Sequence, residues 1–128
     1  MARNATVLAL VLALAGCATG VKPAGFDAAH RAATINESTP SGRHYRAVVA
    51  ERIYHQLVQS GLRCLIDSPH DREAPVTMLF RIDSAGRPAE SMLWPRTRFG
   101  LCAFGGIGDF TLAPPPRNDY WVQVTLRP

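Results

Sequence analysis

Four histidines are the residues of this sequence best suited to acid–base chemistry or metal binding: His30, His44, His55 and His70. Both kinds of chemistry need two or more such side chains close together. His44 and His55 are predicted on one helix, where eleven residues at 1.5 Å each separate them by about 16 Å. His30 falls in a predicted tether and His70 in a polar loop. We therefore interpret all four as surface histidines and predict neither a metal nor a cofactor.

Motifs for nucleophilic or phosphate chemistry are weak. The sequence contains neither G-x-S-x-G nor S-x-x-K, the patterns that place a serine nucleophile. Residues 105–108 (GGIG) lack the lysine and the serine or threonine that complete a phosphate-binding loop. Asp67, Asp71 and Glu73 cluster beside Arg72 in a polar loop. We interpret this cluster as an exposed loop without acid–base function, with weak calcium binding as an alternative. We predict that the protein is not an enzyme and expect no small-molecule substrate; a hydrolase with a non-obvious site is the alternative.

One helix is predicted to begin the folded part, over residues 41–60. Thr39 can cap its start, Pro40 suits its first turn and Gly61 suits its exit. Its apolar positions recur every four residues, at Tyr45, Val49, Ile53 and Leu57. The next stretch, residues 62–66 (LRCLI), is short, apolar and compatible with a strand.

The clearest local structure is a β-hairpin. In residues 76–83 (VTMLFRID) apolar and polar side chains largely alternate, as in a strand with one buried face. Residues 83–86 form a turn, and residues 87–94 return as the partner strand. Residues 96–116 are predicted as a short imperfect helix or compact loop, and residues 119–128 as a closing strand. The fold class is therefore α+β: a small antiparallel three-stranded sheet packed against one or two helices.

The N-terminal stretch indicates export. Arg3 supplies a positive end and residues 7–15 a short apolar core, well below the roughly 20 apolar residues that span a bilayer. These features are typical of a secretory signal peptide. Residues 14–17 (LAGC) resemble the lipobox of bacterial lipoproteins. The resemblance implies that the chain is cut before Cys17, that lipid is attached to its sulfur, and that the new amino group is acylated, as with palmitate.

The residue after the lipobox bears on the location. Lipoproteins kept at the inner membrane usually carry aspartate there, whereas this chain has Ala18. The resemblance thus implies a lipid anchor in the outer membrane, on its periplasmic face. The alternatives are the inner membrane, or an ordinary signal peptide with Cys17 incidental.

Three parts are predicted for the chain: a signal peptide (1–16), a lipidated flexible tether (17–40) and one domain (41–128). The tether is assigned because its many Ala, Thr, Pro and Gly residues offer little apolar surface to bury; its span would be about 25 Å. The net charge of +4 is spread over scattered arginines without a basic stripe. We therefore do not expect nucleic acid as a partner.

Residues 76–94 and 112–126 together resemble the C-terminal domain of the TonB and TolA energy-transducer families. Those domains have a hairpin with D-x-G at its turn, a helix, a proline-rich stop and a final strand. The match covers about residues 43–126. The second helix departs from the family because it is rich in glycine, and the transducers' membrane-spanning helix and long shaft are absent. The resemblance implies the fold and does not imply energy transduction.

The remaining cysteines, Cys64 and Cys102, form an even pair once Cys17 is assigned to lipid. They also stand where the TolA branch carries cysteines. In an oxidising compartment we expect a disulfide, and closing a loop of about 40 residues would add roughly 4 kcal/mol of stability. A reactive or metal-binding thiol pair is the alternative.

Binding through backbone is the function that these features favour. A small sheet has edge strands, and an open edge can accept a strand from a partner, as TonB- and TolA-like domains are known to do. The predicted contact residues lie on the last strand: Trp121, Val122, Val124 and Leu126. We expect a non-catalytic, protein-binding adaptor of the cell envelope, related to Tol–Pal, transport or secretion. The alternatives are a structural subunit of a secretion or trafficking complex, a lipoprotein that blocks phage or bacteriocin use of a transducer, and an edge that binds nothing.

Overall fold

The computed structural model describes residues 20–67 and 74–127. In chain order the elements are α1 (Phe26–Ser38), α2 (Pro40–Asp67), β1 (Val76–Ile82), β2 (Pro88–Trp94), α3 (Arg98–Gly105) and β3 (Tyr120–Leu126). The strands form one antiparallel sheet in the order β2-β1-β3. The predicted α+β class with a small antiparallel sheet is confirmed. Within the described ranges, no helix has the length and apolar character needed to cross a membrane.

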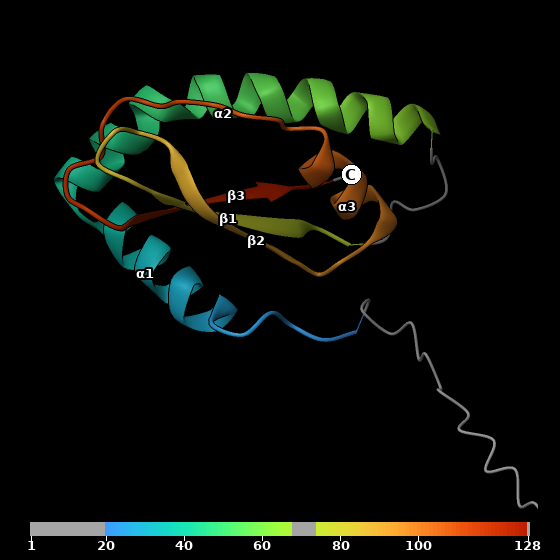
Figure 1. Cartoon of the computed structure of the whole chain (residues 1–128), viewed down its shortest axis with the longest axis horizontal. Helices are drawn as coiled ribbons and strands as arrows, with labels where there is room; N and C mark the ends of the chain where they lie inside the picture. The colour runs from blue at the N-terminus through green and yellow to red at the C-terminus, as the bar shows by residue number, and fades with distance from the viewer. Residues whose placement is uncertain (1–19, 68–73, 128) are drawn as a thin grey trace, which may run out of the picture.

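The sheet is covered on both faces, with α2 along one and α1 across the other (Figure 1). Successive side chains of a strand point to opposite faces, and the central strand β1 is buried on both. Met78, Phe80 and Ile82 pack in the larger core beneath α2 and α3, whereas Leu79 packs against α1. Both faces of the sheet therefore contribute to a hydrophobic core.

Residues 26–38, predicted as part of a flexible tether, instead form helix α1. Its buried residues follow helical spacing: Phe26, Ala29, Ala33 and Asn36. The segment has few large apolar residues, a composition typical of a tether. Alanine nevertheless has the highest helix propensity, and its small side chain lets a helix lie close against a sheet. Ala33 is fully buried there beside Leu79.

Helix α2 begins as predicted and continues further than predicted. Thr39 Oγ1 accepts a 3.0 Å hydrogen bond from the Gly42 amide, and Pro40 is the first helical residue. The helix passes through Gly61 to Asp67, so the strand expected at residues 62–66 is absent. Leu57 and Cys64 are both buried, seven residues apart on one face of the helix. The helix continues past Gly61 because its apolar periodicity continues as well.

The hairpin of β1 and β2 is present with the predicted turn. Asp83 Oδ1 accepts 2.9 Å hydrogen bonds from the amides of Ala85 and Arg87. Gly86 adopts a φ of 83°, and a Cβ there would stand 2.0 Å from the Leu112 carbonyl oxygen. Only glycine fits this position, where the loop before β3 crosses the hairpin turn.

A disulfide joins Cys64 of α2 to Cys102 of α3, with a sulfur–sulfur distance of 2.06 Å. The glycine-rich stretch does contain a short helix, capped by Thr97, whose Oγ1 accepts from the Gly100 amide at 2.9 Å. The Ser60 hydroxyl donates a buried 2.8 Å hydrogen bond to the Ala103 carbonyl oxygen. These contacts fix α3 to α2 at one end of the molecule (Figure 1).

Candidate functional site at the free edge of β3

The sheet has two edge strands, and of these only β2 carries residues that discourage pairing with a further strand. β2 begins with Pro88, which has no N–H to donate, and carries the exposed Glu90. Proline and charge on an edge both discourage pairing with another strand. β3 has the sequence YWVQVTL, with neither proline nor a charged residue. An edge without such protection is the place where this sheet can accept a further strand.

The outward backbone groups of β3 belong to Trp121, Gln123 and Thr125. The Trp121 carbonyl oxygen accepts a 3.1 Å hydrogen bond from the side-chain amide of Asn36 in α1, so it points away from β1. Backbone groups alternate in direction along an antiparallel strand, and those of Gln123 and Thr125 therefore also face outward. Among the described residues, neither has a backbone partner on that side.

A groove with a cavity volume of about 460 Å³ runs between this edge and α2. Its α2 wall includes Val49, Ile53 and Tyr54, and its β3 wall includes Val122 and Val124. The Tyr54 side chain is 65% exposed, so its ring stands at the rim. The groove therefore presents apolar side chains beside unpaired strand backbone, a combination suited to an extended peptide with apolar side chains.

Two phenol rings in edge-to-face contact line the start of the groove. The rings of Tyr45 and Tyr120 meet edge to face, with centroids 5.2 Å apart, and the Tyr45 hydroxyl donates a 2.8 Å hydrogen bond to the Ala113 carbonyl oxygen. Burial, aided by Tyr120, raises the pKa of Tyr45 to about 12, and burial also raises the pKa of Tyr120. Both phenols are thus neutral at physiological pH. The buried Tyr120 hydroxyl has no hydrogen-bond partner in the part of the chain that the structure describes.

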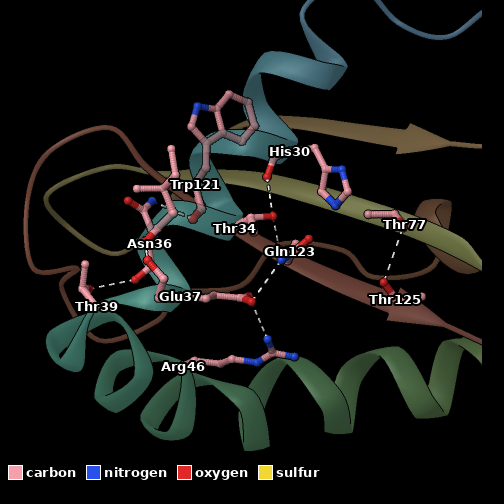
Figure 2. A network of polar contacts seen from close by, with 12 residues as sticks. His30, Thr34, Asn36, Glu37, Thr39, Arg46, Thr77, Trp121, Gln123 and Thr125 are labelled. Atoms are coloured by element: carbon pink, nitrogen blue, oxygen red, sulfur yellow. Dashed lines mark hydrogen bonds and ion pairs between the residues drawn. The ribbon is translucent and has the colours of Figure 1, made fainter.

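A polar clasp, formed by Glu37, Arg46 and Gln123, crosses the beginning of the edge (Figure 2). Glu37 Oε2 accepts from Arg46 Nη1 at 2.6 Å and from Gln123 Nε2 at 3.0 Å. It thereby joins α1, α2 and β3. Asn36 adds a second link, because its Oδ1 accepts from Arg117 while its amide donates to Trp121. α1 therefore holds the Trp121 carbonyl and the Gln123 side chain, whereas the outward backbone groups of Gln123 and Thr125 have no backbone partner among the described residues.

The structure separates the four predicted contact residues into two groups. Val122 and Val124 line the groove, and Trp121 borders it. The Trp121 side chain turns to the opposite face, where it packs on the α1 cluster, and Leu126 packs partly against the larger core beyond the groove. Sequence reasoning missed Glu37, Arg46 and Tyr54, because their role depends on α1 and on the path of α2.

The chemically capable side chains do not gather. His30, His44 and His55 are all exposed, and residues 20–67 and 74–127 hold no group of three His, Cys, Asp or Glu side chains placed to share a metal ion. His70, Asp71 and Glu73, and with them the possible calcium loop, lie outside the described residues, as does Cys17. The candidate site among the described residues is thus the outer edge of β3 with the groove beside it.

The chain matches no protein-family model, no curated protein and no solved structure. The lipobox and the TonB- or TolA-like domain therefore stay predictions.

Proposed function

We propose that this protein is a periplasm-facing lipoprotein of the outer membrane that acts as a non-catalytic adaptor, binding an extended segment of another envelope protein along β3. The observation that carries the proposal is the unprotected outer edge of β3 beside an apolar groove. The envelope address is supported by the lipobox-like residues 14–17 and by the disulfide, which suits an oxidising compartment.

The two sides of the edge define the chemistry of the segment. A strand added to β3 would place alternate side chains on opposite faces. Those toward α2 would enter the groove lined by Val49, Ile53 and Val124. Those on the other face would meet Gln123 and Thr125, whose side chains are polar. We therefore expect a segment with alternating apolar and polar residues, without proline at the paired positions.

Photo-crosslinking in cells is the experiment that identifies the partner. A photoreactive amino acid at Tyr54, on the rim, should give adducts with one envelope protein, through a segment of the alternating kind. The matched control position is Ile66, which is 79% exposed on α2 and does not line the groove. Equal labelling from both positions, or adducts only between copies of this chain, would contradict the adaptor proposal.

A backbone substitution then tests strand addition itself. Thr125→Pro removes an outward N–H and keeps β1–β3 pairing, whereas Thr125→Ala keeps the N–H. Binding of a synthetic peptide of the captured segment, measured by fluorescence anisotropy, should weaken by up to about tenfold for Thr125→Pro, the value of one hydrogen bond. Equal binding by both variants would show that β3 backbone is not used. Circular dichroism of the two variants checks that both are folded.

A further inference from the structure

The chain is attached to the domain from Lys22 onward, four residues before α1 begins. Lys22 Nζ lies 3.0 Å from Asp27 Oδ1 and 5.9 Å from the centroid of the Trp94 ring. The Pro23 carbonyl oxygen accepts a 3.1 Å hydrogen bond from the Phe26 amide. The chain is therefore tied to β2, which ends at Trp94.

The distance from the lipid to the domain is consequently short. Only five peptide units separate Cys17 from Lys22, and they reach at most about 18 Å when fully extended. A lipid on Cys17 would therefore hold the Lys22 end of the domain within about 18 Å of the bilayer surface. This distance is shorter than the span of about 25 Å expected for a flexible tether running to residue 40.

The surface at this end mixes apolar and basic side chains, and we name it the anchor-end patch: Val21, Lys22, Trp94, Arg96 and Leu101. Val21 is 71% exposed and Leu101 is 40% exposed. Pro23, Arg96 and Leu101 line one shallow pocket, which places the start of the chain beside α3. Asp27 is the acidic neighbour, paired with Lys22. Aromatic, aliphatic and basic groups in one patch are typical of surfaces that rest in the headgroup region of a bilayer.

The anchor-end patch and the groove lie at opposite edges of the sheet. Lys22 contacts β2, the groove lies along β3, and β1 separates the two strands. α1 crosses between them, from Gly25 beside Met92 of β2 to Asn36 beside Trp121 of β3. An orientation that brings β2 to the membrane thus turns β3 away from it.

We propose that the anchor-end patch rests on the anionic phospholipid bilayer that holds the lipid, so that β3 faces the periplasm within short reach of the membrane. This inference rests on the lipidation in the proposed function. It implies that the partner segment comes close to the membrane surface, as a periplasmic segment of an outer-membrane protein or of a neighbouring lipoprotein would.

Tryptophan quenching in vesicles tests the orientation. The lipidated protein is reconstituted in phosphatidylethanolamine and phosphatidylglycerol vesicles containing phosphatidylcholine brominated on its acyl chains. The variant Trp121→Phe keeps Trp94 as its reporter, since the chain has two tryptophans. Its emission should fall by roughly half, as for a ring near the acyl boundary. The matched control carries Trp94→Phe, Trp121→Phe and Ile66→Trp, which puts the reporter on α2, and should be quenched severalfold less.

Two results would overturn the inference. One is equal quenching of the two reporters; the other is an unchanged Trp94 signal when Lys22→Glu and Arg96→Glu are added, with Arg52→Glu on α2 as the charge control. Intact-mass measurement of the same sample reports the lipid separately. A chain without lipid contradicts the proposed address, whereas a lipidated chain with unquenched Trp94 contradicts the orientation alone.

Discussion

The side-chain amide of Asn36 donates a 3.1 Å hydrogen bond to the carbonyl oxygen of Trp121, joining the last turn of α1 to the first outward position of β3. Asn36 is only 2% exposed, and its Oδ1 accepts from Arg117. One buried side chain therefore closes the beginning of the edge and defines where its open part starts.

Asn36→Ala should lower the free energy of unfolding by about 2 kcal/mol, because it removes two hydrogen bonds from a buried position. Urea denaturation followed by circular dichroism measures the change. Ile35→Ala is the control, since Ile35 is 61% exposed in the same turn. A loss no larger than that of the control would mean that the Asn36 contacts contribute nothing.

Helix α1 should be part of the cooperative fold. Ala33→Asp would bury a carboxylate at a fully buried position and should cost about 3 kcal/mol or more. Ala28→Asp, at an exposed position of the same helix, should change stability little. Denaturant midpoints of both variants check this. Equal midpoints would restore the view that residues 26–38 are a tether.

The disulfide should stabilise the domain by about 4 kcal/mol, because it closes a loop in the unfolded chain between cysteines 38 positions apart in the sequence, Cys64 and Cys102. The measurement compares the denaturant midpoint of the oxidised protein with that of the Cys64→Ser, Cys102→Ser double variant. Labelling of the oxidised, denatured protein by a thiol reagent should modify neither residue. Labelling of both would rule out the bond.

Alkaline pH should destabilise the protein through Tyr45. Its pKa is 10.0 when unperturbed and about 12 in the fold. The contribution is fully present below pH 10 and is lost as pH rises toward 12, since only the unfolded phenol ionises in that window. The loss should be about 2 kcal/mol. Tyr45→Phe should show a correspondingly weaker pH dependence of its unfolding free energy than the unsubstituted protein.

The sequence predicts correctly those helices and strands in which large apolar side chains recur at a regular spacing. The hairpin followed from alternation at Met78 and Phe80 together with the turn at Gly86, and β3 from alternation after the prolines. These signals are local. They also placed Val122 and Val124 on the strand that the structure puts at the edge.

The parts that could not be predicted depend on contacts between distant segments. Ala29 and Ala33 have a composition typical of a tether, and they become core residues only because α1 packs on the sheet face that carries Leu79. Gly61 indicates a helix end in the sequence, yet it lies buried inside α2 beside the Phe99 ring of α3. Only the first of these two differences bears on the groove, because α1 closes its beginning, whereas its α2 wall lies within the predicted helix over residues 41–60.

Amide hydrogen exchange on β3 tests strand addition most directly. The free protein should already protect the Val122 and Val124 amides through β1, while the Gln123 and Thr125 amides exchange fast. Adding the peptide captured by crosslinking should slow exchange at Gln123 and Thr125 at least about tenfold, with little change at Val122 and Val124. Unchanged exchange at Gln123 and Thr125 with the peptide bound would contradict the central claim.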